Sequence, residues 1–383
     1  MKKKVLIFGP IADYGGREVE CGFIANALSA NFTVEVCSTG SISEKTQVLD
    51  LNPGLKIFSV EQLLYKKAPI LKVVEFINDV KNRLKGRPWD YKNNVIAKKY
   101  FRYNEKVNLV VEEIVQQYDL VFICAQFRSK LLAQCIAAAK KHGINVVFRT
   151  TGVIKEKNFD FIAQVNCFLH HSQRNARLLD DVPNQGYRII DQCALNEKQL
   201  LEIPAASQKI KTFLTIARLV EEKNIDVVIG AFQQLKSEGH KLYIIGDGPK
   251  KNDLMQMAAH NENVIFTGHV PNEKISEYFE TADCVIISHY NFETGPLTGI
   301  EAMAAGRIII SAKTGAMQER LPFSNFWFDN TISDLAAQMQ DAVALDADQV
   351  KQQSAAIRER YLNEYNAAKI SSKYLNTVAT LIS

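Results

Sequence analysis

The feature that most constrains how this chain folds is an alternation of short β-type runs with amphipathic helical runs. In the amino-terminal half, each apolar run is followed, after a turn, by residues with helical periodicity. Strands that alternate with helices in this way form a parallel sheet covered by helices. The strands predicted in this half are 4–8, 32–37, 119–124 and 145–148.

The same alternation restarts after a polar stretch at 196–209, which indicates a second domain. The chain has 383 residues, and a domain typically has about 150. We therefore predict an α/β protein with two doubly wound, Rossmann-like domains. The expected parts are a first domain at 1–192, a hinge at 193–209, a second domain at 210–363, and a terminal helix at 364–383 that packs back on the first domain. The strands predicted in the second domain are 211–216, 241–245, 263–266, 283–288 and 307–311.

Positive charge is concentrated in one segment of the first domain. The chain has a net charge of +4, but residues 63–106 alone hold twelve Lys and Arg against four Asp and Glu, which is +8. Seven aromatic residues lie among them. Such a segment suits an anionic membrane surface, a lipid-linked phosphate or a nucleic acid, and a solvated helical face is the plain alternative. We expect peripheral contact with an anionic membrane and no nucleic-acid partner.

Other features of the sequence bear on where the protein resides. The apolar run after Lys2-Lys3-Lys4 stops at Gly9-Pro10, which is too short for a signal peptide. The seven cysteines lie far apart, mostly in apolar runs, as core residues of a reducing compartment do. We expect a cytoplasmic protein, in part on the inner face of the membrane.

Ligands of open parallel sheets bind beyond the carboxyl ends of the strands, so three loops of the second domain are the candidate binding loops. The first runs from Ala217 to Asn224 and contains Arg218 and Lys223. Two cations at a strand end and a helix start converge on one anion, and we predict that they clamp a diphosphate. A surface loop with randomly paired charges is the alternative.

The second loop is Gly246-Asp247-Gly248-Pro249, which follows the predicted strand 241–245. Gly246 and Gly248 allow a tight turn and a close approach of the backbone to a ligand. As part of a Gly-x-Gly-x-x-Gly pattern the match is incomplete, because Lys251 stands where the third glycine belongs. The loop is equally consistent with a plain connector between strand and helix.

The third loop runs from His289 to Gly306 and reads HYNFETGPLTGIEAMAAG. Pro296 suits the first position of a helix and Gly306 the position beyond its end. The backbone amides around Pro296, namely those of Gly295, Leu297 and Thr298, would then lie at the positive end of a helix dipole. There they would bind phosphate. Glu293 and Glu301 would be repelled by that phosphate, so we expect Glu293 to bind hexose hydroxyls and Glu301 a ribose diol.

Together these loops resemble the GT-B glycosyltransferases of family 4, the retaining and metal-independent enzymes that use sugar nucleotides. The family's motifs match in order and spacing across some hundred residues. They are Ala217 to Lys223, Gly246 to Pro249, Ala282 to Ser288, Glu293 to Gly306, and Gly315 to Glu319. The resemblance implies two domains that face a central cleft, with acceptor binding by the first and donor binding by the second.

The first domain resembles the family more loosely. Gly15 and Gly16 match a glycine pair near the donor phosphate, and His171-Ser172 match a position after a strand. Ala125-Gln126-Phe127 stand where many members carry a His, and Ile190 to Cys193 replace the usual Asn-Gly-x-Asp. The acceptor side therefore departs from the pattern of the family.

The resemblance implies transfer of a hexosyl group from a UDP- or GDP-linked sugar to a glycan or lipid-linked acceptor hydroxyl, in surface polysaccharide synthesis. Arg218, Lys223 and Glu293 are the expected catalytic residues. No cofactor or metal is expected, because no Asp-x-Asp motif stands at a strand end. Two alternatives are a sugar-nucleotide 2-epimerase of the same fold and a catalytically degenerate subunit that binds a partner glycosyltransferase.

Overall fold

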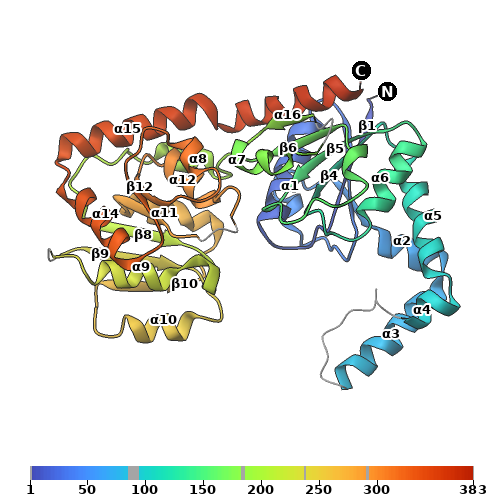
Figure 1. Ribbon diagram of the computed structural model, residues 1–383, viewed down its shortest axis with the longest axis horizontal. Helices are drawn as coiled ribbons and strands as arrows, with labels where there is room; N and C mark the ends of the chain where they lie inside the picture. Colours follow the sequence, from blue (N-terminus) through green and yellow to red (C-terminus); the bar gives the residue numbers. More distant parts are fainter. Residues whose placement is uncertain (1, 85–94, 183–185, 237–238, 290–292, 383) are drawn as a thin grey trace. The chain divides into compact units, whose positions relative to one another are not determined.

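A computed structural model describes residues 2–84, 95–182, 186–236, 239–289 and 293–382 (Figure 1). The chain divides into two compact units, and each is described by itself. Unit 1 comprises 1–169, 179–188 and 371–383, and unit 2 comprises 170–178 and 189–370. The segment 170–178 and the expected hinge at 193–209 thus belong to unit 2. The last boundary falls inside the terminal helix.

The described residues of unit 1 form a seven-stranded sheet in the order β3-β2-β1-β4-β5-β6-β7. The pairings from β3 to β6 are parallel. The strands are β1 (Lys4–Gly9), β2 (Thr33–Ser38), β3 (Lys56–Ser59), β4 (Leu120–Ala125), β5 (Asn145–Thr150), β6 (Cys167–His170) and β7 (Tyr187–Ile189). The helices are α1 (Gly16–Ser29), α2 (Val60–Lys67), α3 (Pro69–Leu84), α4 (Val95–Tyr100), α5 (Tyr103–Val115) and α6 (Leu132–Lys141).

Unit 2 has a six-stranded sheet in the order β10-β9-β8-β11-β12-β13, and every pairing in it is parallel. The strands are β8 (Thr212–Ile216), β9 (Lys241–Ile245), β10 (Val264–Gly268), β11 (Cys284–Ile287), β12 (Ile308–Ala312) and β13 (Trp327–Phe328). The helices of the unit, in chain order, are α7 (Gln173–Ala176), α8 (Glu197–Glu202), α9 (Ile225–Phe232), α10 (Lys251–Met257), α11 (Ile275–Thr281), α12 (Leu297–Ala304), α13 (Met317–Arg320), α14 (Ile332–Ala344), α15 (Ala347–Glu364) and the start of α16 (Ala367–Ile382).

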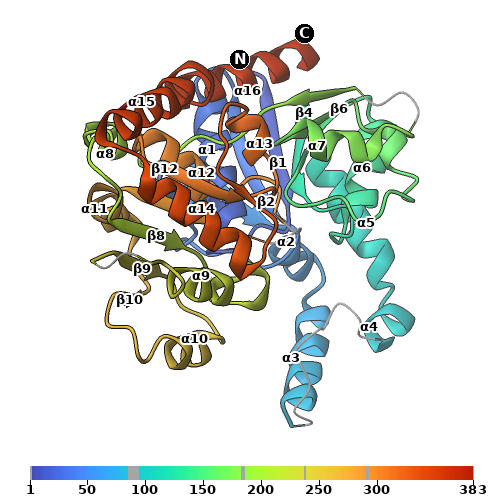
Figure 2. The ribbon, with the colours of Figure 1, turned by 60° about the vertical axis from the view of Figure 1, so that its left-hand side comes forward.

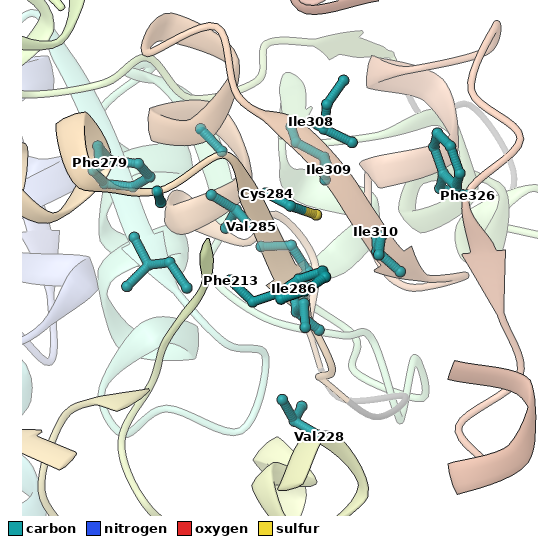
Figure 3. Close-up of a cluster of buried hydrophobic side chains, with 14 of the residues drawn as sticks. Phe213, Val228, Phe279, Cys284, Val285, Ile286, Ile308, Ile309, Ile310 and Phe326 are labelled. Atoms are coloured by element: carbon teal, nitrogen blue, oxygen red, sulfur yellow. The ribbon is translucent and has the colours of Figure 1, made fainter. Parts of the chain in front are cut away.

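The core of unit 2 lies on both faces of its central strands (Figure 3). Every residue of β11 and β12 is buried, as expected for parallel strands covered by helices on both sides. Their β-branched residues pack against aromatic side chains such as Phe213 and Phe279. Helix α8 joins this core through Leu200, so the stretch predicted to be a hinge is packed rather than loose.

The core of unit 1 is built in the same way, and the carboxyl-terminal helix completes it. Tyr374 of α16 is buried and its ring lies 6.1 Å from that of Phe122 on β4. All seven cysteines of the chain are buried and none forms a disulfide, which confirms their interpretation as core residues. In the part of the chain that the structure describes, no helix is both long and apolar enough to span a bilayer.

The strand order fixes where a ligand can bind in each unit. In unit 2 the order reverses between β8 and β11, because the chain proceeds from β8 outward to β10 and then returns to the other side. Parallel sheets bind ligands at such a switch point, beyond the carboxyl ends of the strands. The loops that follow Ile216 and Ile287 therefore border the expected site. Helix α12 contacts β11 and lies beside the next strand, β12, in both views (Figures 1 and 2).

Candidate active site

Three side chains meet beyond the ends of β8 and β11. The Nζ atom of Lys223 lies 2.6 Å from Oε2 of Glu293 and 3.5 Å from Nδ1 of His289. The same His289 nitrogen is 3.5 Å from Oε2 of Glu293. The hydroxyl of Ser288 donates to the carbonyl of Lys223 at 2.7 Å, which ties the two loops together at their base. The structure thus brings together two of the three predicted catalytic residues.

The charges of this cluster are set by its burial and by its own members. Burial alone would raise the pKa of Glu293, but hydrogen bonding to His289 and the charge of Lys223 outweigh burial and lower it to about 2. Burial also lowers the pKa of His289, and Lys223 lowers it further against the opposing effect of Glu293. At neutral pH the cluster therefore holds an ionised carboxylate and an uncharged imidazole.

Helix α12 begins next to the cluster with amides that no side chain caps. Pro296 is the residue before the helix rather than its first residue, which corrects the predicted position, because its ψ of 120° is extended. Among the described residues, no acceptor bonds the amides of Leu297 and Thr298. The Thr298 hydroxyl donates to the carbonyl of Ile216 at 3.3 Å and fixes the helix start at the end of β8. The result is a set of donors suited to an anion.

The end of α12 agrees with the prediction. Gly306 follows the helix in the left-handed conformation, with φ of 59°. Its amide donates to the carbonyl of Met303 at 3.0 Å, and the next amide, of Arg307, donates to Ala302 at 3.0 Å. A residue other than glycine is disfavoured in that conformation, so the sequence defines this end well.

Glu301 lies one turn into α12 and is almost completely buried, with 8% of its surface exposed. Burial raises the pKa of this carboxyl to about 7. In the part of the chain that the structure describes, no side-chain hydrogen bond compensates it. A buried acceptor without a partner is costly, so this carboxyl is suited to a ligand hydroxyl that supplies the missing bond.

The glycines of the second loop have a clear structural role. A Cβ atom on Gly246, whose φ is 139°, would lie 1.9 Å from the carbonyl oxygen of Ala217, and one on Gly248 would lie 2.4 Å from that of Leu219. The amide of Leu219 donates to the carbonyl of Asp247 at 2.9 Å. The glycines therefore allow the second loop to pack directly on the first loop, and whether they also contact phosphate stays a prediction.

Arg218 is not brought into the cluster. Its side chain is exposed and, within the described residues, forms no hydrogen bond or ion pair. Its role in a diphosphate clamp with Lys223 stays a prediction.

A buried ion pair that the sequence analysis missed supports the start of α12. Arg320 of α13 is fully buried and binds both carboxylate oxygens of Asp191 at 2.7 and 2.8 Å. It also donates to the carbonyl of Pro296 at 2.6 Å. A Cβ atom on Gly295 would lie 3.1 Å from Arg320 and 3.2 Å from Gln192, so only glycine fits here without displacing them.

Glu319, the last residue of the fifth matched motif, binds the start of α7. Its two carboxylate oxygens accept from the amides of Gln173 and Arg174 at 2.8 and 2.9 Å. Ser172 caps the same short helix, since its hydroxyl accepts from the amide of Asn175 at 3.1 Å. This contact explains why segment 170–178 packs with unit 2.

In unit 1, Gly15 and Gly16 stand at the start of α1, where Gly15 has φ of 143° and donates to the Gln47 side chain at 2.9 Å. Glu18 turns back and accepts from the amide of Ala12 at 2.9 Å. The glycine pair therefore forms the turn after β1, and its proposed contact with a donor stays a prediction. Across the described residues, no group of three or more His, Cys, Asp or Glu is arranged to hold a metal ion.

Comparison with known families identifies the domain that holds this cluster. Residues 197–360 match the family model described as "Glycosyl transferases group 1". The match covers less than half of the chain, and it lies within unit 2. This confirms the resemblance predicted from the motifs, and all the residues of the Lys223 cluster and α12 lie inside the domain.

Curated relatives match over parts of the chain. Alpha-monoglucosyldiacylglycerol synthase of Streptococcus pneumoniae is 39% identical over 106 residues, which are 26% of this chain and 24% of that protein. Putative colanic acid biosynthesis glycosyltransferase WcaL of Salmonella typhimurium is 25% identical over 181 residues, 44% of this chain and 45% of that protein. The chain thus spans less than half of the length of these relatives.

Solved structures match over the whole chain. Alr3699/HepE of Anabaena in complex with UDP aligns with a TM-score of 0.72 at 14% identity, covering 98% of this chain and 100% of that one. A glycosyltransferase of Rickettsia africae aligns with a TM-score of 0.73 at 16% identity, covering 100% and 99%. At such identities the likeness shows the fold alone, and it confirms the GT-B class with two parallel-sheet α/β domains.

Proposed function

We propose that the protein is a retaining glycosyltransferase that moves a hexosyl group from a UDP- or GDP-linked sugar to a hydroxyl of a glycan or a lipid-linked acceptor, in the synthesis of surface polysaccharide or glycolipid. The observation that carries the proposal is the pairing of Lys223 with Glu293 beside the uncapped start of α12, inside a group 1 domain. The relatives support the acceptor class, since their names include a glycolipid synthase and a polysaccharide glycosyltransferase.

In this proposal the diphosphate binds the amides of Leu297 and Thr298 and the amine of Lys223, with Arg218 completing the clamp. The bond between the anomeric carbon and the diphosphate breaks, and the acceptor oxygen bonds to that carbon from the same face. The acceptor's proton passes to the leaving phosphate oxygen, so no separate base is needed. Negative charge grows on the diphosphate in the transition state, where fixed cations and amides stabilise it most.

The two glutamates hold the neutral ends of the donor. Glu293 is ionised and accepts hydrogen bonds from hexose hydroxyls, while Glu301 lies deeper and binds the ribose diol. His289, uncharged at neutral pH, offers one donor and one acceptor beside the sugar. The solved structure of HepE with UDP-glucose supports a UDP-linked donor.

The test is a calorimetric binding screen of UDP- and GDP-linked hexoses, followed by transfer assays with the donor that binds. Lys223→Ala should lower the transfer rate by at least about a hundredfold, because it removes a cation from the leaving group. Lys209→Ala is the matched control, since Lys209 is an exposed lysine of unit 2 and should be neutral. Unchanged transfer by Lys223→Ala would refute the clamp. Product formed from donor alone would indicate an epimerase, and no donor binding would indicate a degenerate subunit.

A further inference from the structure

Helix α3 (Pro69–Leu84) of unit 1 has an exposed apolar stripe along one face. Ile70, Val73, Phe76, Ile77 and Val80 have between 40% and 68% of their surface exposed. Four of them are spaced at i, i+3, i+7 and i+10, which places them on one side of a helix, with Phe76 at its margin. Single exposed apolar residues are common, but five within eleven positions form a continuous surface that calls for a partner.

The stripe is not the face by which α3 is attached to unit 1. Leu71 is buried in the core of the unit and lies on the other side of the helix, while Val74, which borders the stripe, is partly buried against the same core. Helix α3 contacts α2 and α4. Both views show α3 and α4 projecting away from the sheet of unit 1 (Figures 1 and 2). The exposure of these five side chains shows that the described part of the chain leaves the stripe uncovered.

Positive charge lies on the helix that carries the stripe and on the two helices that this helix contacts. Exposed lysines lie at the end of α2 (Lys66 and Lys67), on α3 (Lys72) and in the last turn of α4 (Lys98 and Lys99). Lys67 is paired with Glu113, and Lys99 lies 5.3 Å from the ring of Tyr100, which is itself 67% exposed. The other three have no ion-pair partner within the described part of the chain. Part of the basic segment 63–106, namely 85–94, lies outside the described residues.

We propose that the α3 stripe, meaning Ile70, Val73, Phe76, Ile77 and Val80, docks on the surface of a bilayer that contains anionic lipids. The apolar side chains enter the boundary between headgroups and acyl chains, and the lysines of α2, α3 and α4 bind the lipid phosphates. An apolar stripe flanked by lysines and an exposed tyrosine is suited to such an interface. The proposal concerns a binding surface and holds independently of the transfer reaction.

A second copy of the chain fits the stripe less well. In a symmetric dimer the same surface meets itself, so the lysines of one copy would face those of the other. Like charges at an interface repel, whereas a layer of lipid phosphates neutralises them. The charge pattern therefore favours an anionic membrane over self-association.

The experiment is co-sedimentation of the full chain with vesicles of phosphatidylcholine, with and without phosphatidylglycerol. We expect binding to the anionic vesicles that weakens at high salt, as screening of lysine and phosphate charges requires. The double variant Phe76→Ser with Ile77→Ser should lower the partition coefficient at least about tenfold, because two large apolar side chains no longer enter the bilayer. The matched control is Met255→Ser with Met257→Ser, two exposed residues on α10, which should bind vesicles as the unmodified protein does.

Equal binding to both kinds of vesicle, or full binding by the Phe76 and Ile77 variant, would overturn the proposal. Light scattering identifies the other occupant: a dimer that the same variant makes monomeric would show that a second copy covers the stripe, and would also overturn it. Calorimetric binding of the sugar nucleotide by each variant keeps this result separate from the proposed transfer function. A variant that still binds the donor but leaves the vesicles has lost only the membrane surface.

Discussion

Replacing Glu301 by Gln should stabilise the protein without ligand and weaken donor binding at the same time. Burial raises the pKa of this carboxyl from 4.5 to about 7. A folded state that binds the proton more tightly than the unfolded state loses stability as pH rises between those two values. At about 1.4 kcal/mol per pH unit, ionisation of Glu301 costs about 3 kcal/mol once the pH exceeds 7. Gln has the same shape and does not ionise, so the variant avoids that cost.

The measurement is urea unfolding at pH 5, 6, 7 and 8, followed by the fluorescence of Trp327. This residue lies on β13 of unit 2, and replacing Trp89, the only other tryptophan, with Phe isolates its signal. The stabilisation by Glu301→Gln should grow from pH 5 to pH 8. Glu262→Gln, at an exposed position of the same unit, should show no such dependence. Equal effects of Glu301→Gln at pH 5 and pH 8 would refute the argument, because they would show that ionisation of this buried carboxyl costs nothing.

The same substitution should change donor affinity in the opposite direction from stability. A carboxylate accepts hydrogen bonds from a ribose diol more strongly than a neutral acid does. The affinity of the unmodified protein for the donor should therefore rise as pH increases from 6 to 8, and that of Glu301→Gln should be lower and nearly independent of pH. Calorimetry across this range measures both. Together with the unfolding data, this would show that the site maintains a costly group for the sake of its ligand.

Two further predictions concern the support of the site. Asp191→Ala should destabilise unit 2 by about 3 to 5 kcal/mol in urea unfolding, because it leaves Arg320 buried and unpaired. The double variant Asp191→Leu with Arg320→Met should recover most of that loss. An equal loss of stability in the single and the double variant would contradict the reasoning. Gly246→Ala should cost on the order of 3 kcal/mol in the same assay, since its Cβ would meet the Ala217 carbonyl. Gly239→Ala, in the same unit and with φ of 86° but open space around it, is the control for backbone strain alone and should cost clearly less.

The sequence predicts those parts of the fold that periodicity and turn chemistry control. The strands β8, β9, β11 and β12 were located within two residues, because each is an apolar run that ends at a polar or glycine-containing loop. The short strands β3, β6, β7 and β13 were not predicted. They are two to four residues long and acquire their extended form from pairing with a neighbour, which no local pattern records.

The same division holds for the candidate site. Lys223, Glu293 and Glu301 were found because a motif fixes their spacing, and the structure shows how two of them pair. His289 lies within the stretch that opens the third loop, and its place two residues after the buried strand β11 was the available signal. Asp191 and Arg320 were missed because they are 129 positions apart and meet only in the folded chain. The exact position of Pro296 depends on its ψ angle, which sequence does not give.

The pairing of Lys223 with Glu293 constrains how the proposed reaction can be arranged. Both side chains are only about a quarter exposed, so giving Lys223 entirely to a diphosphate would leave a largely buried carboxylate without its cation. An ammonium group has three donors and a carboxylate about four acceptor sites. The pair can therefore remain bonded at 2.6 Å while Lys223 binds a phosphate oxygen and Glu293 binds a sugar hydroxyl. This arrangement would hold the leaving group and the sugar ring at adjacent ends of one ion pair, with the bond that breaks lying between them. It would also explain why both charges lie at the same switch point of the sheet.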